Sequence, residues 1–523
     1  MSIRVVPRAP AEDGAVTAEP PLREVGRLVA SNRLRMRRDG RSLSGRSWSE
    51  VQSRARTAAV DAARQYMGRR GEPVPDPDGL ELIMAGHQPE LFHPGVWVKN
   101  FALNGLARRH GLTALNLIVD NDTVKTTALR LPTPAAVKSS HPHAVAEPFD
   151  RWSSEIPYEE RPILDPVVFA GFADRAGAAM RGWGYSPMLP DFWAEVRREA
   201  EQTPLLGECF AAARRTYERR WGCHNLELPV SALCRTEPFA WFAFHLLAEL
   251  PRFHAAYNAG VHDYRKRHGI RSRNHPVPDL AEEDGWLEAP FWGWRAGPTR
   301  RGRLFARPQA DGIALRIGDE LWPSLPNKDP AAAWMERERQ GFKVRSRALT
   351  NTLYARLFLS DLFIHGIGGG KYDELTDDLI RRFYECEPPE FLVLSATRLL
   401  PLPTASVHSE DHGRLAHELR DLYWNPQRRL PANDARLWEL AARKWEWIAR
   451  EPTDAAGRLE RFLALRSATT VLRDPLKENE ERLRQELAAT DQRLEANAVL
   501  RRRDYAFCLY PEETLRPFCT QFL

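Results

Sequence analysis

The stretch from Gly86 to Lys99 gathers residue types that can do phosphate chemistry. Its polar side chains include His87, Gln88 and His93. A histidine in such a loop can stabilise charge that develops on a phosphate or act as an acid or a base, and a lysine can pair with a phosphate. The alternative is a capped loop whose histidine bonds to the backbone. Zinc binding by His87 and His93 is not favoured, because no third ligand stands at a suitable spacing.

Two carboxylates flank an asparagine in the run Asp120-Asn121-Asp122. Carboxylates in a loop of this kind suit the binding of a ribose, an amine or Mg²⁺. Simple helix capping is the alternative, because Asp and Asn are common capping residues. Asp120 and Asp122 are therefore candidates for holding a substrate or Mg²⁺, and capping stays open as the other interpretation.

A glycine-rich segment contains Gly366, Gly368, Gly369 and Gly370 and ends in Lys371. Glycines let backbone N–H groups approach an anion closely, and a lysine adds positive charge. The segment is not a Walker A loop, because a histidine replaces its first glycine and a tyrosine replaces its Ser or Thr. It predicts contact with a nucleotide or a substrate, and the alternative is a tight turn between packed elements.

Regular elements must place these loops close together. Apolar runs at 82–85 and 115–119 predict strands, and the segment 99–110 between them predicts a helix. The chemical residues follow the carboxyl ends of both strands. In an open parallel sheet, ligands bind at that edge, so the order of elements indicates the core of a nucleotide-type enzyme.

Further elements follow from periodicity and turn residues. Ser47 and Glu50 form a capping-box pattern that predicts a helix over 51–67. Helical periodicity recurs over 190–220 and 236–268. A rigid loop is expected at 274–278, and the last clear strand of this region at 391–394. Short antiparallel strands are expected at 291–294, 303–305 and 312–316.

The C-terminal part carries a heptad pattern of leucines. Leu476, Leu483, Leu487 and Leu494 stand at a/d spacing with charged residues between them. The pattern predicts a coiled coil, either a helical hairpin or the seam of a homodimer. We expect a flexible tail over 1–24, a Rossmann-like catalytic core with insertions over 25–425, the coiled-coil arm over 426–500, and a C-terminal segment over 501–523 that packs on the core.

Composition narrows the class of protein. The 523 residues contain 75 Lys and Arg against 70 Asp and Glu, so the net charge of +5 does not favour nucleic-acid binding. The six cysteines form no CxxC pair, which indicates neither zinc nor a disulfide framework. No apolar run is long enough for a membrane span, and the first 24 residues lack the apolar region of a secretion signal. We therefore expect a cytoplasmic protein.

In their order along the chain, these motifs resemble those of the bacillithiol-biosynthesis cysteine-adding enzymes. The run from Ala85 to Phe92, with the later Pro-Gly turn and Lys99, is similar to the loop of that family, which usually reads Thr-Gly-Gln-Gln-x-Gly-Leu before a Gly-Pro-Leu turn and a lysine-bearing helix. The resemblance covers most of 80–500. Further similar runs are Val119–Asp122, Tyr257-Asn258, Tyr264-Arg265, Pro276–Pro278, Arg347–Leu349, His365–Gly369 and the late heptads.

The resemblance implies a Rossmann-like, nucleotidyltransferase-like α/β core with inserted helices and a small β region, plus a coiled-coil arm. It also implies a reaction that joins cysteine to the amino group of a glucosaminyl-malate through carboxyl activation. The chain differs from the family in three site loops. His87 replaces a glutamine, Asn121 replaces a histidine, and Gly369-Gly370-Lys371 replaces Pro-Gly-Glu. These differences predict an altered substrate.

The resulting hypothesis is a ligase that joins an amino acid to an amine, with ATP or ADP and Mg²⁺ as candidate cofactors. Its proposed catalytic residues are His87, Lys99, Asp120 and Asp122. Its proposed cofactor contacts are Gly86, Gln88, Gly366, Gly368, Gly369, Gly370 and Lys371. The alternative is a non-catalytic scaffold or dimerisation protein that retains the fold.

Overall fold

The computed structural model describes residues 7–37, 42–133, 143–271, 277–431 and 434–523, so the loop expected at 274–278 lies largely outside the described residues. The chain divides into two compact units. We call them the sheet unit (Met1–Leu131, Ala146–Leu400 and Arg503–Leu523) and the helical unit (Pro132–Val145 and Pro401–Arg502). No helix among the described ranges has the length and apolar character needed to cross a membrane.

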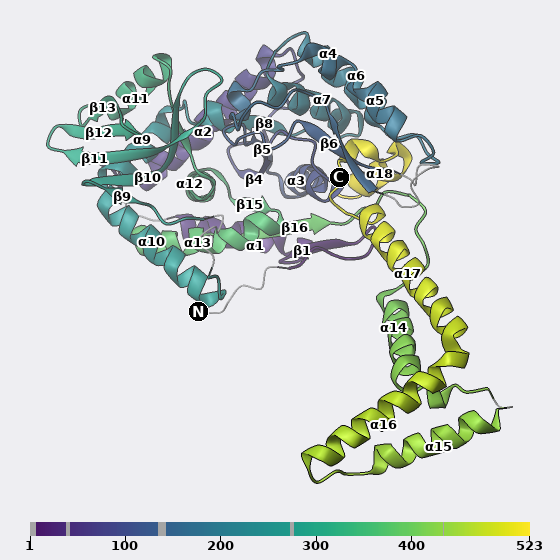
Figure 1. Ribbon diagram of the computed structural model, residues 1–523. Coiled ribbons are helices and arrows are strands. Elements are labelled where there is room, and N and C mark those ends of the chain that lie inside the picture. The colour runs from purple at the N-terminus through teal and green to yellow at the C-terminus, as the bar shows by residue number, and fades with distance from the viewer. Residues whose placement is uncertain (1–6, 38–41, 134–142, 272–276, 432–433) are drawn as a thin grey trace. The chain divides into compact units, whose positions relative to one another are not determined.

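The sheet unit is built on a six-stranded sheet in the order β1-β16-β15-β4-β5-β8 (Figure 1). Its strands are β1 (Val16–Glu19), β4 (Leu82–His87), β5 (Thr113–Ile118), β8 (Leu226–Pro229), β15 (Leu362–His365) and β16 (Phe391–Ala396). All pairs are parallel except β1 with β16. The strands expected at 82–85, 115–119 and 391–394 are confirmed, within one to two residues at their ends. This unit is a mixed α/β structure around a mainly parallel sheet.

Alternate residues of β4 enter two different apolar cores, one on each face of the sheet. Leu82 and Met84 belong to the core that includes α2 (Trp48–Arg69), whereas Ile83 and Ala85 belong to the core that includes α3 (Pro94–His110). A strand covered on both faces needs the continuous apolar run seen in the sequence. One half of the expected capping box is confirmed, because Ser47 is the N-cap of α2 and its side chain accepts a hydrogen bond from the backbone N–H of Glu50.

The sheet unit contains a second, antiparallel sheet in the order β13-β12-β11-β10-β14, with β9 paired to β10. Its strands are β9 (Glu282–Glu283), β10 (Trp286–Arg295), β11 (Gly302–Gln309), β12 (Gly312–Ile317), β13 (Glu320–Pro326) and β14 (Phe342–Ser346). The expected antiparallel strands at 291–294, 303–305 and 312–316 lie within β10, β11 and β12. Helix α11 (Pro330–Arg339) connects β13 to β14.

Helices complete the sheet unit. The helix expected over 236–268 is two helices, α9 (Glu237–Ala248) and α10 (Leu250–Arg267), because a proline in the first turn of α10 is incompatible with the interior of one continuous helix. The others are α1 (Val25–Met36), α4 (Pro166–Ala170), α5 (Phe172–Ala179), α6 (Leu189–Ala200), α7 (Leu206–Arg220), α8 (Val230–Leu233), α12 (Ala348–Tyr354), α13 (Ile367–Phe383) and α18 (Glu512–Thr520).

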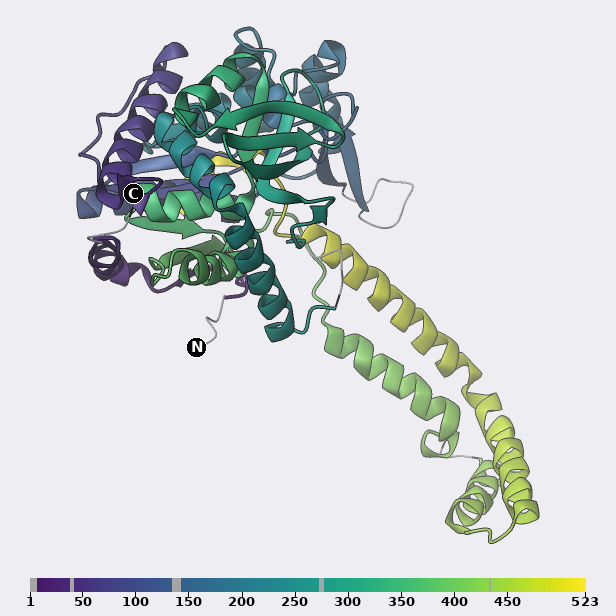
Figure 2. The ribbon, with the colours of Figure 1, turned by 90° about the vertical axis from the view of Figure 1, so that its left-hand side faces the viewer.

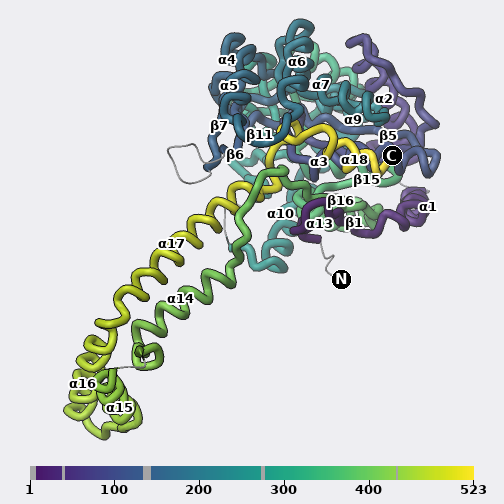
Figure 3. Tube along the Cα trace, turned by 90° about the vertical axis from the view of Figure 1, so that its right-hand side faces the viewer, coloured from purple at the N-terminus to yellow at the C-terminus, as the bar shows by residue number. Residues whose placement is uncertain are grey.

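The helical unit consists of α14 (Ser409–Trp424), α15 (Ala435–Ala449), α16 (Ala455–Arg473) and α17 (Lys477–Leu500). Helices α14 and α17 lie side by side (Figure 2) and antiparallel, since Asn497 bonds to Ala405 while His412 lies 3.3 Å from Asp491. The heptad leucines Leu476 and Leu483 pack against leucines of α14. Helices α15 and α16 form a second pair (Figure 3).

Two expected boundaries differ from the structure. The helical unit begins at Pro401 instead of residue 426, because α14 supplies the apolar partner of α17. The stretch 1–24 is not simply a tail, because Val16–Glu19 forms strand β1 through backbone hydrogen bonds to β16. Backbone pairing of this kind does not depend on side-chain periodicity, so a four-residue edge strand leaves little trace in the sequence. Residues 503–523 belong to the sheet unit.

Candidate functional site

The strand order creates a crevice between β4 and β15. From β4 the sheet continues through β5 and β8 in one direction and through β15 and β16 in the other. Helix α3, after β4, packs on one face of the sheet, while α13, after β15, contributes to the core on the opposite face. The two connections therefore diverge at the carboxyl ends of β4 and β15. In open α/β sheets this switch point is where ligands bind.

A cavity of about 460 Å³ lies at this switch point. Gly86 and His87 line it from β4, and His365 and Gly366 line it from the end of β15 and the start of α13. The 365–369 segment and the 86–99 loop therefore meet, as the sequence predicted. We call this space the switch-point cavity.

Two long helices begin at the switch-point cavity. The N-cap residue of α3 is His93, whose side chain does not bond to the backbone of the helix. The N-cap residue of α13 is Gly366, which has no side chain. The first N–H groups of an α-helix have no partner within the helix, and the helix dipole makes this end positive. The N-terminus of α13 can therefore bind an anion through backbone N–H groups, whereas α3 begins with Pro94, which has no N–H, and the N–H of Val96 already donates to the carbonyl oxygen of His93.

Lys99 is a buried cation between the ends of the two strands. Its Nζ donates to the carbonyl oxygen of Gly86 at 3.3 Å and lies 3.8 Å from where a Cβ on Gly366 would stand. The side chain is 3% exposed, and burial lowers its pKa to about 8. Among the residues that the structure describes, no carboxylate forms an ion pair with Lys99.

Arg503, which is half-buried, is a second cation at this cavity, and no pattern in the sequence indicated it. Its Nη2 donates to Ser395 Oγ and to the carbonyl oxygen of Ala396, both at 3.1 Å. Burial lowers its pKa, and no described carboxylate forms an ion pair with it. The position of Gly95 explains the contact, because a Cβ there would lie 2.9 Å from Arg503 Nη2 and 2.1 Å from the Ala396 oxygen.

Three histidines line the cavity, and the surroundings keep each of them neutral near pH 7. Burial and the charge of Lys99 lower the pKa of His87 to about 3, and burial and Arg503 lower that of His93 to about 4. His87 Nδ1 lies 3.2 Å from the carbonyl oxygen of Gln88, which can only accept, so the proton sits on Nδ1. His87 therefore makes the backbone hydrogen bond that was expected as the alternative, and it also lines the cavity.

His365 is held by a carboxylate. Its Nε2 lies 3.0 Å from Asp373 Oδ2, and the same carboxylate receives a bond from Arg356. Burial lowers the pKa of His365 although Asp373 opposes the shift, and Arg356 and His365 together hold the pKa of Asp373 well below its usual value in spite of burial. The proton of the neutral ring is therefore on Nε2, which leaves the Nδ1 lone pair beside Gly369, where a Cβ would lie 2.9 Å away.

The two carboxylates of the 120–122 loop point to different places. Asp120 accepts from the backbone N–H of Ser231 at 2.9 Å and from the Ser231 hydroxyl, which ties the 120–122 loop to the segment after β8. It lines a neighbouring cavity of about 270 Å³, where burial and the charge of Glu159 raise its pKa to about 7. Asp120 is the N-cap of no described helix, and it does not line the switch-point cavity.

Asp122 is held in an ion pair. It lies 2.8 Å from Arg301 and accepts from Gln88 Nε2 at 2.9 Å. Burial alone would raise its pKa, but these partners lower it. Asp122 therefore positions Gln88, which lines the switch-point cavity, and has no free charge for a cation.

The placement of Lys371 differs from the expected nucleotide contact. The residue is exposed in α13 and does not line the switch-point cavity, whereas Gly366, Gly368 and Gly369 do. Gly370 packs instead against β16, since a Cβ there would lie 2.6 Å from Val393. No cluster of three or more His, Cys, Asp or Glu suited to a metal ion occurs among the described residues.

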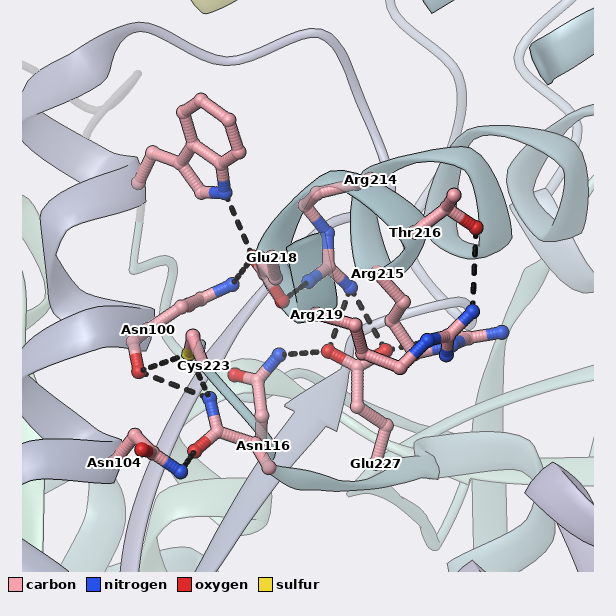
Figure 4. A network of polar contacts seen from close by, with 12 residues as sticks. Asn100, Asn104, Asn116, Arg214, Arg215, Thr216, Glu218, Arg219, Cys223 and Glu227 are labelled. Atoms are coloured by element: carbon pink, nitrogen blue, oxygen red, sulfur yellow. Dashed lines mark hydrogen bonds and ion pairs between the residues drawn. The ribbon is translucent and has the colours of Figure 1, made fainter. Parts of the chain in front are cut away.

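A buried ionic network anchors helix α3 from its other side (Figure 4). Trp97 and Asn100 of α3 each donate to Glu218 at 2.7 Å, and Arg214 binds Glu218 and Glu227 at 2.6–2.8 Å. Trp97 and Asn100 flank Lys99 at distances of two and one positions along the helix. The network therefore fixes the backbone that carries the buried lysine.

Comparison with models of known protein families found no match for this chain, and a search of curated proteins found no significant similarity.

Proposed function

We propose that this protein is an enzyme that binds a nucleotide, ATP or ADP, in the switch-point cavity and uses it to join an amino acid to an amine. The observation that carries the proposal is that the buried Lys99 and the half-buried Arg503 line one cavity, and that no carboxylate is among its described lining residues. Buried charges are normally paired, so this arrangement calls for an anionic ligand.

The N-terminal ends of α3 and α13 carry the positive ends of their helix dipoles, so they attract an anion as the two cations do. Phosphate oxygens placed against Gly366–Gly369 would accept from the free N–H groups of α13, while Lys99 neutralises their charge. The described residues offer no ready-made metal cage, so Mg²⁺ would be carried by the phosphates together with at most one or two protein ligands. We propose a Rossmann-like, nucleotidyltransferase-like core for the sheet unit, on the basis of its strand order.

The proposed reaction has two steps. A carboxylate oxygen of the amino acid attacks a phosphorus atom of ATP, and the bond from that phosphorus to the departing ADP or pyrophosphate breaks. The amine nitrogen then attacks the carbonyl carbon, and phosphate or AMP leaves with the original carboxylate oxygen. His365 Nδ1 takes the proton that the amine loses, because Asp373 holds the opposite ring nitrogen protonated. The resemblance to the cysteine-adding enzymes suggests this class of substrates, with the exact amine altered.

Calorimetric titration tests the nucleotide part of the proposal. We expect wild type to bind ATP or ADP, and we expect Lys99→Met to weaken binding by about 30-fold or more, as expected for loss of a buried charge partner. Lys371→Met is the matched control, since that lysine is exposed outside the cavity and should bind as wild type does. If wild type binds neither nucleotide nor pyrophosphate at millimolar concentration, the proposal is wrong.

A scaffold or homodimerisation role is the second candidate, and a feature of the helical unit favours it. Leu459, Phe462 and Leu463 of α16 are all more than half exposed, and Trp438 and Trp445 of α15 are each 47% exposed. Large exposed apolar side chains that form a patch often mark protein contacts. The heptad leucines Leu476, Leu483 and Leu487 pack within the chain, so a dimer would use the exposed side chains of α15 and α16 instead. We also propose that α14 and α17 form a coiled coil.

A deletion strain separates the two candidates. Untargeted metabolite analysis should show an accumulating amine and a missing conjugate if the protein is the ligase. An unchanged metabolite pool together with a lost protein complex would favour the scaffold. We further propose a cytoplasmic location, which the six buried cysteines without disulfides suit.

A further inference from the structure

A side lobe next to the switch-point cavity contains polar atoms that lack partners. The lobe has a volume of about 220 Å³, and Gln88, Val119, Ala348 and Asn351 line both spaces. Among the described residues nothing bonds to Asn121 Oδ1, Ser346 Oγ or Asn351 Oδ1, although these side chains line the lobe. Their residues are only 4%, 0% and 6% exposed, respectively. A buried polar atom without a partner destabilises the fold, and a bound hydrogen-bond donor would recover that cost.

The bonding of Asn121 fixes which of its atoms is left over. Its Nδ2 donates to the backbone carbonyl oxygen of Ser346 at 2.7 Å. A carbonyl only accepts, so the amide nitrogen must stand there and the free atom must be the acceptor Oδ1. Among the described residues, none forms a hydrogen bond that would fix the Asn351 amide, so this side chain can present either its oxygen or its nitrogen. The lobe therefore offers one fixed acceptor and one adaptable group.

The charged residues of the lobe neutralise one another. Asp122 pairs with Arg301 at 2.8 Å, and Arg347 pairs with Glu288 at 2.6 Å. Both guanidinium groups also stack on Trp292, at 4.5 Å and 4.2 Å from its ring centre. These pairs leave no free carboxylate for an ammonium ion, and the two stacked guanidiniums would repel one. Uncharged donors suit the lobe better than cations.

We propose that this lobe binds the second substrate through an uncharged group that donates hydrogen bonds, a free-base amine or a hydroxyl. The donor hydrogens bond to Asn121 Oδ1 and to Asn351. The assignment to a second substrate rests on the proposed function. A nucleophile attacks only with a free lone pair, so a lobe that rejects the ammonium form holds the amine in its reactive state beside the cavity where the carboxyl is activated.

Fluorine NMR on the full-length protein can detect such binding without knowledge of the natural substrate. The probe is 2,2,2-trifluoroethylamine, which loses its extra proton below neutral pH, and the same-sized comparison is 2,2,2-trifluoroethanol. We expect saturable line broadening of at least one probe. Tighter binding of the amine assigns an N–H substrate, and tighter binding of the alcohol assigns an O–H substrate. Amine binding should strengthen as the pH rises through the pKa of the probe.

Charged ethylammonium tests the rejection of cations. At neutral pH it should not displace the neutral probe from wild type. Asn351→Asp replaces the amide with a carboxylate of the same shape, and in that variant ethylammonium should displace the probe. If ethylammonium competes with wild type as well as the neutral amine does, or if neither probe binds, the proposal is overturned.

Alanine variants locate the site. Asn121→Ala and Asn351→Ala should each weaken probe binding about three- to tenfold, since a neutral hydrogen bond contributes about 0.5–1.5 kcal/mol. Asn104→Ala is the control, because Asn104 Oδ1 is also buried without a described partner but does not line the lobe. Unchanged binding in both lobe variants would contradict the proposal. ATP binding is measured in a separate titration. A protein that binds ATP but neither probe contradicts the lobe proposal alone, and one that binds a probe but no nucleotide contradicts the nucleotide proposal alone.

Discussion

Two regions of the sheet unit bury positive charge, and they do so in opposite ways. In the network beside α3, Arg214, Arg215 and Arg219 face three carboxylates, and Glu227 alone accepts from Arg214, Arg215 and Asn116. In the switch-point cavity, the described lining residues include Lys99 and the half-buried Arg503 but no carboxylate, and no described carboxylate forms an ion pair with Lys99. The pKa values follow this difference, since burial lowers that of Lys99 to about 8 while the carboxylates hold that of Arg214 above its usual value in spite of burial.

The comparison shows how to distinguish a structural charge from a functional one. A paired buried charge is neutralised by other residues of the chain, and its removal leaves its partners buried without a counter-charge. An unpaired buried charge is a cost to the folded protein until a ligand neutralises it. Substitution of a paired buried charge should therefore lower stability, whereas substitution of an unpaired one should leave it unchanged or raise it.

The largest effect is expected from Glu227→Gln. The change removes one of the two carboxylates that each of the buried guanidiniums of Arg214 and Arg215 binds, and we expect the free energy of unfolding to fall by about 3–5 kcal/mol. Urea denaturation followed by circular dichroism measures it. Glu320→Gln is the control, since the Arg295–Glu320 pair is about half exposed and should change stability by less than about 1 kcal/mol. Equal effects of the two variants would show that the network is not a stabilising one.

Lys99→Met should act in the opposite direction on stability. Methionine fills a similar volume without charge, so we expect the melting temperature of the free protein to stay the same or rise while ATP binding is lost. Thermal denaturation with and without ATP measures both. A strong fall in stability without ATP would mean that Lys99 is paired within the chain after all, and the contrast between the two regions would disappear.

The titration of Lys99 predicts a pH dependence. Its pKa is lowered from 10.5 to about 8 in the folded protein, so between these values the unfolded chain binds more protons and stability due to this residue rises with pH. The difference in unfolding free energy between wild type and Lys99→Met should therefore narrow from pH 8 to 10.5. ATP affinity should fall as the pH rises through about 8, because the neutral amine no longer attracts phosphate. A flat difference in stability across this range would contradict the assignment.

The smallest effect is expected at two neighbouring glycines. A Cβ at Gly369 would lie 2.9 Å from His365 Nδ1, whereas at Gly368 it would meet nothing within 4 Å. Gly369→Ala should displace the imidazole and weaken ATP binding a few fold. Gly368→Ala should raise stability by up to about 1 kcal/mol, because alanine favours the helix. Calorimetry and thermal denaturation compare the pair, and identical behaviour would remove His365 from the site.

Prediction from sequence succeeded where local pattern suffices. The apolar runs at 82–85 and 115–119 predicted two central strands, and the glycines after His365 allow close packing against His365 and Val393. Contact of these glycines with a nucleotide or a substrate stays a prediction. Prediction from sequence did not identify the partners of the 120–122 carboxylates, since Asp120 binds Ser231 and Asp122 binds Arg301, 111 and 179 positions away in the chain. The alternation of residue types carries no information about partners so far apart.

The sequence by itself determined the parallel sheet, its helices and the edge where polar loops gather, because periodicity and glycine placement act within a few residues. Only the tertiary structure decided which charges are paired. It brought Arg503 to the start of α3, tied Asp373 to His365, and left Lys99 without a carboxylate among the described residues. Pairing depends on distances set by the whole fold and on burial that removes water, and neither quantity is written in local spacing.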